Sequence, residues 1–258
     1  MLHNSLHNED CIITMSRIKD KTVDLIIADP PYFEICGEFD FLWGSQSEYL
    51  SWCKHWITEC FRILKNTGTI YIWGKIGFGK GYSLFKLCDW IETQKIFFVQ
   101  SWVTQKNSRG RGTRKSYMNA REELVHMTKS KTYTWNPVYL SELTNRKDLG
   151  FDGKPRKSLF KRCSDVWIDI AEASQSSKER FKTSAGESFP TVKAIKLCNR
   201  IIQSSSNPGD LVYIPFAGSG SEIVSCILHH RKWIASEINR KYVEDIIKPR
   251  LKSHFLSI

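Results

Sequence analysis

The sequence predicts an α/β fold in which a mostly parallel central sheet carries helices on both faces, with a loop-rich segment inserted. Over the first half of the 258-residue chain, short apolar stretches alternate with segments of helical spacing, which is typical of parallel strands joined by helices. Residues 131–189 lack that periodicity. The apolar content of 41% is ample for a packed core and too high for a disordered chain.

The first half of the chain supplies most of the expected sheet. Residues 22–28 predict a buried strand that ends at Asp29, and residues 47–64 have apolar side chains at helical spacing. Gly68 then opens a strand over 69–73. The remaining elements expected in this half are a helix near 81–93 and strands near 95–104 and 122–128.

The pattern changes at residue 131 and returns at Pro190. Residues 131–189 are rich in Ser, Lys, Asn and Gly with isolated aromatic residues, so we expect an inserted subdomain. Regular structure then resumes, which divides the chain into 1–130, 131–189 and 190–258. The elements expected after the insert are a helix over 190–204, a strand over 211–214, a helix over 219–230, a strand over 232–236 and a helix over 240–254.

The formal net charge of +11 is concentrated in one part of the chain. Residues 103–163 hold 15 Lys and Arg against 5 Asp and Glu, an excess of +10, which leaves the rest near neutral. Such a concentration indicates a polyanionic partner, most plausibly nucleic acid. Within this basic stretch, glycines let the backbone approach phosphates, and arginines can form paired hydrogen bonds with phosphate oxygens or guanine edges. The alternative is a solvated loop. The cations expected to contact nucleic acid are Arg109, Arg111, Arg114, Lys115 and Arg121.

Other classes of protein fit the composition poorly. No apolar run approaches the roughly 20 residues that a membrane span needs, and residues 1–10 show no signal-peptide pattern. None of the eight cysteines forms a Cys-x-x-Cys pair, so we expect no metal site and mostly small core residues. A reducing cytoplasm is the simplest setting.

The first chemical motif is Asp29-Pro30-Pro31-Tyr32, directly after an apolar strand. Ligands of α/β sheets bind at the carboxyl ends of the strands. Two prolines stiffen the loop and remove two N–H donors, so the loop presents the Asp29 carboxylate, the Pro30 carbonyl and the flat face of Tyr32. These groups suit a planar ring that bears an exocyclic amino group. The alternative is a proline turn with an exposed aromatic residue.

The second motif is Phe216-Ala217-Gly218-Ser219-Gly220, between an expected strand and a helix. Its glycines allow a ligand close to the backbone, and a helix N-terminus offers free N–H groups. The segment Ser236-Glu237-Ile238-Asn239 ends the next strand, where a carboxylate is well placed to accept ribose hydroxyls. A glycine turn without these partners is common in α/β proteins. Neither G-x-G-x-x-G nor a P-loop is present, so a dinucleotide or a nucleoside triphosphate fits poorly.

Together these motifs resemble the amino-group DNA methyltransferases that use S-adenosylmethionine, over nearly the whole chain. The catalytic tetrapeptide precedes the cofactor loop, an order similar to the permuted β group with its Rossmann-like methyltransferase fold. Further segments also resemble the family: Asn8-Glu9-Asp10-Cys11, Phe189-Pro190-Thr191-Val192-Lys193, Arg121-Glu122 and Asp165-Val166-Trp167. The resemblance implies catalytic roles for Asp29, Pro30, Pro31 and Tyr32, and cofactor-binding roles for Asp10, Lys193, Phe216, Ala217, Gly218, Ser219, Gly220, Glu237 and Asn239.

The chain departs from the family pattern beside the cofactor loop. Ile214 stands where the family usually has an acidic residue, and Phe189, Val192 and Ala194 replace its usual His, Gln and Pro. The missing carboxylate predicts weaker cofactor binding, or binding left to Asp10, Lys193 and Glu237.

The resemblance implies methyl transfer to the N6 amino group of an adenine turned out of double-stranded DNA, because Asp at the first position of the tetrapeptide resembles adenine enzymes. Cytosine-N4 methylation and a non-catalytic DNA-binding protein are the alternatives. The parts 1–130, 131–189 and 190–258 would be the catalytic half, the target-recognition insert and the cofactor-binding half. The resemblance also raises a homodimer and a separately acting restriction endonuclease as further partners.

Overall fold

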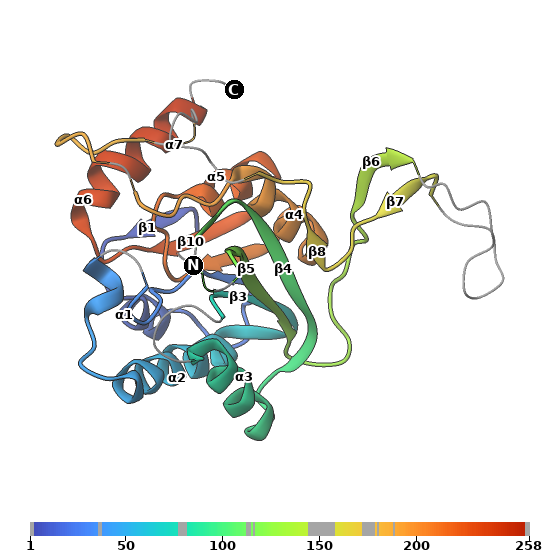
Figure 1. Ribbon diagram of the computed structural model, residues 1–258, viewed down its shortest axis with the longest axis horizontal. Coiled ribbons are helices and arrows are strands. Elements are labelled where there is room, and N and C mark those ends of the chain that lie inside the picture. Colours follow the sequence, from blue (N-terminus) through green and yellow to red (C-terminus); the bar gives the residue numbers. More distant parts are fainter. Residues whose placement is uncertain are drawn as a thin grey trace.

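A computed structural model describes residues 3–35, 38–76, 82–111, 115, 117–143, 158–171, 179, 181–187 and 189–255. In this part of the chain an eight-stranded sheet has the order β1-β10-β9-β2-β3-β5-β4-β8 (Figure 1). Helices cover both of its faces. The predicted α/β architecture is therefore confirmed.

Five neighbouring strands are parallel: β1 (Ser5–His7), β10 (Lys232–Ser236), β9 (Leu211–Ile214), β2 (Val23–Ala28) and β3 (Leu64–Gly74). The two strands that precede the sequence motifs are adjacent, because β9 pairs with β2 through Val212 and Leu25. The strands expected over 22–28, 211–214 and 232–236 are confirmed. Strand β1 was not expected, since three residues are too few for a visible period.

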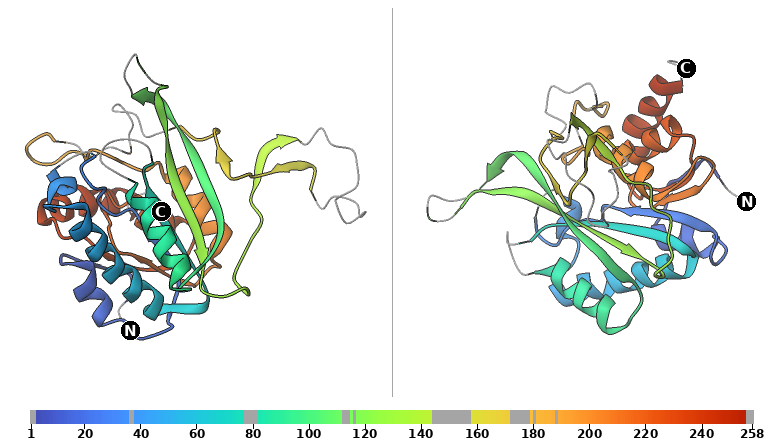
Figure 2. Two further views of the ribbon diagram at one scale, coloured as in Figure 1. Left: turned by 60° about the horizontal axis from the view of Figure 1, so that its bottom comes forward. Right: turned by 90° about the vertical axis from the view of Figure 1, so that its right-hand side faces the viewer.

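The other edge of the sheet is a long hairpin. Strands β4 (Phe98–Arg111) and β5 (Asn119–Thr128) pair antiparallel, and β5 is also antiparallel to β3. Their paired ends extend well beyond the rest of the sheet (Figure 2). The hairpin therefore reaches past the edge where β2 and β9 end.

Each face of the sheet buries its own apolar cluster. One cluster packs Ile26, Ile70 and Val125 against α1 (Cys11–Ser16), α2 (Gln46–Ile63) and α3 (Ser83–Thr93). The second cluster packs Leu25, Tyr71 and Val212 against the helices of the other face. Those helices are α4 (Ile195–Ser205), α5 (Ser221–Leu228), the π-helix Val243–Ile247 and α7 (Lys248–Phe255). The short helix α6 (Arg240–Tyr242) precedes the π-helix and has no buried residue.

Most of the described cysteines are buried, as the sequence predicts. The seven cysteines in the described part are free, and five of them are buried. Cys36 lies outside the described residues. No described helix is long and apolar enough to cross a membrane.

The inserted segment holds more regular structure than its composition predicts. Strands β6 (Tyr139–Leu143) and β7 (Phe160–Arg162) form a two-stranded sheet that projects from the body (Figure 1). Strand β8 (Val166–Trp167) joins the main sheet beside β4. Helix α4 begins at Ile195 rather than at Pro190, because Ala194 is extended, with φ −64° and ψ 136°. A 3₁₀ helix, Glu38–Phe41, follows the loop that holds residues 29–32.

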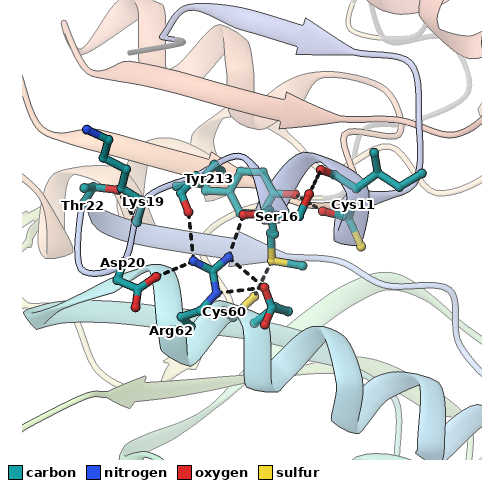
Figure 3. Close-up of polar contacts among 12 residues, drawn as sticks. Cys11, Ser16, Lys19, Asp20, Thr22, Cys60, Arg62 and Tyr213 are labelled. Atoms are coloured by element: carbon teal, nitrogen blue, oxygen red, sulfur yellow. Dashed lines mark hydrogen bonds and ion pairs between the residues drawn. The ribbon is translucent and has the colours of Figure 1, made fainter.

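Arg62 ties the end of α2 to the turn between α1 and β2 (Figure 3). Its guanidinium donates to the carbonyls of Met15 and Ile18 at 2.7 and 3.0 Å, at and just after the end of α1. It also contacts the carboxylates of Asp20 and Glu59 at 2.6 and 2.8 Å. This one side chain therefore holds the start of the strand that leads to Asp29.

We expect Arg62→Met to lower the free energy of unfolding by about 2 kcal/mol, because the charged hydrogen bonds of Arg62 to two carbonyls and two carboxylates are lost. Urea denaturation measures the effect. The control is Lys19→Met, an exposed side chain in the same view (Figure 3), which should stay within about 0.5 kcal/mol of the parent. Equal effects of the two changes would contradict the assigned role.

Candidate active site

The motif residues meet at one edge of the sheet. Because β1, β10, β9 and β2 are parallel neighbours, their carboxyl ends lie together. Those ends carry residues 8–10, 237–239, 216–220 and 29–32 respectively. The sequence motifs that lie far apart in the chain are therefore brought to a single rim.

Asp29 is held by a hydroxyl and an ammonium group. Tyr32 donates its hydroxyl to Asp29 Oδ1 at 2.8 Å, and Lys193 Nζ lies 3.1 Å from Oδ2. The side chain of Asp29 is 18% exposed and that of Lys193 is 7% exposed. Burial raises the pKa of the Asp29 carboxyl, and the Lys193 ammonium opposes that rise. Lys193 therefore favours the ionised, hydrogen-bond-accepting form of Asp29.

Lys193 also pairs with a second carboxylate and lies over an aromatic ring. Its Nζ is 2.9 Å from Glu122 Oε2 on β5 and 4.6 Å from the centre of the Trp73 ring on β3. Burial works to lower the pKa of Lys193, but the charges of Asp29 and Glu122 raise it overall. For Glu122, the ammonium outweighs the effect of burial and lowers the pKa. Asp29, Lys193 and Glu122 thus form one buried charge cluster.

The Asp29–Tyr32 loop is held by two hydrogen bonds from neighbouring elements. Tyr32 donates its backbone N–H to the buried Asp40 carboxylate at 2.6 Å, and the Tyr49 hydroxyl donates to the Pro31 carbonyl at 3.0 Å. A small cavity of about 30 Å³, lined in part by Pro30, Tyr32 and Trp73, adjoins this loop. That volume holds about two waters.

The Phe216–Gly220 loop has a backbone conformation that glycine favours. Gly218 and Gly220 have φ values of +51° and +77°. A Cβ at Gly218 would lie 2.9 Å from the Phe189 ring, so a side chain there would clash with it. Gly220 is the N-cap of α5 and supplies no side chain to its first turn. The loop therefore leaves a backbone-lined rim at a helix N-terminus.

The carboxylates near this loop are tied to backbone N–H groups. Glu237 accepts from Gly218 N at 2.8 Å and from Asn239 N at 2.9 Å. Asp10 caps α1 by accepting from Ile12 N at 2.8 Å. Each carboxylate has about four lone-pair sites, so both retain acceptor capacity.

Two side chains of the Phe216–Gly220 loop contact the surrounding fold. Arg250 donates to the carbonyl and hydroxyl of Ser219 at 3.0 and 3.3 Å, and Ser219 is buried. Phe216 packs its ring 5.3 Å from that of Trp56 on α2. Ile214, where the family usually has a carboxylate, is fully buried in the second apolar cluster. It therefore supplies no polar group to the rim.

Sequence reasoning missed Glu222, a buried carboxyl in the first turn of α5. Burial raises its pKa to about 7, and the charge of Asp29 adds to the rise. In the sequence Glu222 is an ordinary helix residue. Its burial and its interaction with the charge of Asp29 arise only in the folded chain.

We expect Glu222→Gln to change how stability depends on pH. A carboxyl whose pKa is raised on folding contributes stability below its unfolded pKa and loses it as pH rises through the folded pKa. Between pH 5.5 and 8 the parent should therefore lose about 2 kcal/mol relative to Glu222→Gln. Urea unfolding at the two pH values measures this. Glu244→Gln, at an exposed position, should follow the parent, and parallel curves for Glu222→Gln would contradict the assignment.

Most of the residues predicted to bind DNA have side chains that the structure does not describe. Arg114 lies outside the described residues, and only the backbone of Arg109 and Arg111 is described, on β4. Lys115 is exposed. Arg121 is exposed on β5 and lies 3.1 Å from Glu123. Within the described part of the chain, no group of three His, Cys, Asp or Glu side chains suits a metal ion.

Known proteins resemble the chain in sequence and in fold. The N6/N4 DNA methylase family model matches residues 23–248. The type II methyltransferase M.BamHI of Bacillus amyloliquefaciens is 31% identical over 96% of the chain, which spans 57% of that relative. The DNA adenine methyltransferase YhdJ of Escherichia coli (strain K12) is 31% identical over 91% of the chain and 78% of its own length. The solved cytosine-N4-specific PvuII DNA methyltransferase has a TM-score of 0.70 at 16% identity, covering 99% of this chain and 92% of that one.

Proposed function

The chain belongs to the N6/N4 DNA methylase family, and from that premise we propose that it is a site-specific methyltransferase acting on adenine N6 in double-stranded DNA, with S-adenosylmethionine as methyl donor. The observation that carries the proposal is the complete Asp29–Tyr32 loop, with Asp29 held by Lys193 at 3.1 Å beside the glycine loop. A protein that had lost catalysis would be free to lose this loop.

The residues at the rim fit the methyl donor. The positive φ values at Gly218 and Gly220 give backbone access, and Glu237 and Asp10 offer carboxylate oxygens to hydroxyl and amino groups. We assign binding to these residues with Phe216, Ala217 and Asn239, and assign Ser219 to support of the loop. When bound, S-adenosylmethionine supplies an electrophilic methyl group on a sulfonium.

Asp29 acts on the amino group of the target base. The lone pair of an exocyclic amino nitrogen is delocalised into the ring, which makes it a poor nucleophile. Acceptance of its N–H hydrogens by Asp29 and the Pro30 carbonyl favours a more tetrahedral nitrogen with an available lone pair. The nitrogen becomes acidic only once it is methylated, so Asp29 need not be a strong base. The main contribution of the protein is alignment.

The target base reaches this loop only outside the duplex. Tyr32 stacks on it, which recovers about 1–3 kcal/mol of the cost of unstacking. The Tyr32 hydroxyl donates a hydrogen bond to Asp29 Oδ1 at 2.8 Å. The amino group of the base therefore has to replace that hydrogen bond. The basic stretch around Arg109, Arg111, Arg114 and Lys115, together with Arg121, then contacts the backbone, and residues 131–189 read the sequence.

Two methylated bases are chemically compatible with the loop. Asp29 at the first position of the tetrapeptide favours adenine, and the relative YhdJ carries the name DNA adenine methyltransferase. The structural neighbour PvuII is named as cytosine-N4-specific, so cytosine-N4 methylation is the second candidate. Pairing with a separate restriction endonuclease is consistent with the type II relative.

Expression in a bacterial host without DNA methylation tests the proposal. Sequencing of modified bases should reveal N6-methyladenine at one short sequence, and a host carrying Asp29→Ala should show none. N4-methylcytosine at a defined site would select the second candidate. Unmodified DNA, with soluble protein present, would contradict both and favour a non-catalytic DNA-binding protein.

A further inference from the structure

A strip of aromatic and cationic side chains runs along one face of the β4–β5 hairpin, beside the start of α3. Its aromatic part consists of Tyr82 and Phe85 at the start of α3 and Trp102 on β4. Its cationic part consists of Lys106 on β4 and Arg121 on β5, which are paired in the register of the hairpin. These five residues form the hairpin strip.

The register of the hairpin places the strand residues of the strip on one face. Thr104 pairs with Glu123, and Lys106 pairs with Arg121. Alternate residues of a strand, and directly opposed residues of two strands, point to the same face of a sheet. Trp102 therefore shares its face with both of these pairs. The strip runs from α3 towards the paired strand ends that extend beyond the rest of the sheet (Figure 2).

One buried carboxylate holds both parts of the strip. Glu123 is only 1% exposed. Its Oε2 accepts hydrogen bonds from Trp102 Nε1 and from the Thr104 hydroxyl, both at 2.8 Å. Its Oε1 lies 3.1 Å from Arg121 Nε. The indole and the guanidinium are therefore positioned before a ligand arrives, which lowers the entropic cost of binding.

The exposed stacking surface of the strip is provided by Phe85 and Tyr82. The ring of Phe85 stacks on that of Trp102, with 5.3 Å between the centroids and 29° between the planes. Tyr82 meets Phe85 edge to face at 6.2 Å. Phe85 is 51% exposed and Tyr82 is 57% exposed, so both rings keep surface that is open to solvent. Exposed aromatic rings beside cations are typical of surfaces that stack the bases of single-stranded nucleic acid.

The strip begins next to the site of the proposed reaction. The small cavity beside the Asp29–Tyr32 loop is lined by Tyr32 and also by Ser83 and Leu84 from the start of α3. The cationic part is connected to the same site through β5. The arginine of the strip directly precedes Glu122, which lies 2.9 Å from Lys193 in the buried charge cluster.

The exposed charge of the strip favours a polyanion over a protein surface. Lys106 is exposed, and the side chain of Arg121 is 56% exposed, whereas the neighbouring carboxylate of Glu123 is buried. Positive charge at one end and aromatic rings at the other match the phosphates and the bases of one strand. Bases inside a duplex stack on one another, so only unpaired nucleotides offer their faces to these rings.

We propose that the hairpin strip binds a short unpaired stretch of DNA beside the target base, with bases on Phe85 and Tyr82 and phosphates on Lys106 and Arg121. The inference rests on the proposed action on DNA, and it adds a contact for nucleotides other than the methylated one. Turning a base out of the duplex removes a stacking partner from its neighbours, so an aromatic surface beside the loop offsets part of that cost. Stacking accepts every base, so the strip adds affinity without reading sequence.

Fluorescence anisotropy with two labelled single strands of about eight nucleotides tests the stacking contact. One strand is oligothymidine, and the other is an abasic strand of equal length, which keeps the phosphates and lacks the bases. The parent should bind oligothymidine about tenfold more tightly than the abasic strand. Phe85→Leu and, independently, Tyr82→Leu should remove most of that preference by weakening only the binding of oligothymidine.

Phe98→Leu is the matched control for the aromatic variants. Phe98 is 45% exposed on β4 but does not belong to the strip, so this variant should keep the preference of the parent. A parent without any preference for oligothymidine would overturn the proposal. Equal preferences in the parent, Phe85→Leu and Tyr82→Leu would overturn it as well.

The salt dependence of binding tests the phosphate contacts. The double variant Lys106→Gln with Arg121→Gln should lower the slope of log K against log salt by about 1.4 for a single strand, and it should keep the preference for bases. Lys19→Gln with Lys232→Gln removes two exposed cations outside the hairpin and should leave the slope unchanged. Equal slopes for the two double variants would overturn the assignment of Lys106 and Arg121.

Two further measurements separate the strip from methyl transfer and from self-association. Asp29→Ala should keep the preference for oligothymidine. A preference that Phe85→Leu removes, in a chain that does not methylate DNA, would support the strip and contradict the proposed reaction. Methylation of DNA with an unchanged preference in Phe85→Leu would overturn the strip alone. Light scattering that shows a parent dimer becoming a monomer in Phe85→Leu, with oligothymidine binding unchanged, would identify a second copy as the occupant and overturn the proposal.

Discussion

Replacement of Asp29 by alanine should lower the rate of methyl transfer by about 10³-fold while duplex binding stays within about twofold. Asp29 is the acceptor for the amino group in the proposed reaction, and its contacts are with Tyr32 and Lys193 rather than with the exposed cations of the basic stretch. Single-turnover transfer and fluorescence anisotropy of a labelled duplex measure the two quantities.

Asp29→Asn provides the matched control for shape. It keeps the size of the side chain and one acceptor oxygen, but it removes the charge opposite Lys193. We expect it to lose activity nearly as fully as Asp29→Ala and to unfold at a similar urea concentration to the parent. Full activity in either variant would remove Asp29 from the mechanism.

Lys193→Met should lower methyl transfer by about 10²-fold at pH 7 and shift the pH–rate profile to higher pH. The cluster would then hold Asp29 and Glu122 without the ammonium that lies 3.1 and 2.9 Å from them. Because burial already raises the pKa of Asp29, loss of the cation raises it further and protonates the acceptor. Rates measured between pH 6 and 9 should therefore recover as pH increases.

Two companion variants separate this effect from cofactor binding, the role that the sequence suggested for Lys193. Lys193→Arg should restore part of the activity, and the double variant Lys193→Met with Glu122→Gln should recover part of the loss because one buried negative charge is removed. A pure cofactor role would weaken binding of S-adenosylmethionine without moving the pH profile. That outcome would contradict the positioning role.

The sequence predicts the sheet where strands are long and apolar, as in β2 and β9, because a buried strand leaves a continuous apolar run. Parallel pairing then brings residues 29–32 and 216–220 to one rim. The contact of Lys193 with Asp29 has no local signal, since it depends on an extended segment before α4 and on a carboxylate from β5. Glu222 is also hidden, because burial created by distant segments gives it its raised pKa.

The composition of the insert was a poor guide to its structure. Strand β8 has two residues and becomes visible only by pairing with β4. Residues 139–143 and 160–162 pair with each other on the projecting arm rather than on a core. Their side chains are mostly exposed, so no apolar alternation marks them in the sequence.

Incubation of the purified chain with methyl-labelled S-adenosylmethionine and unmethylated bacterial DNA tests the central claim most directly. The account predicts label in DNA that is recovered as N6-methyladenine after digestion to nucleosides, with cofactor binding detectable by calorimetry. Asp29→Ala should bind the cofactor and transfer no label. An absence of label in DNA together with an absence of cofactor binding would contradict the account.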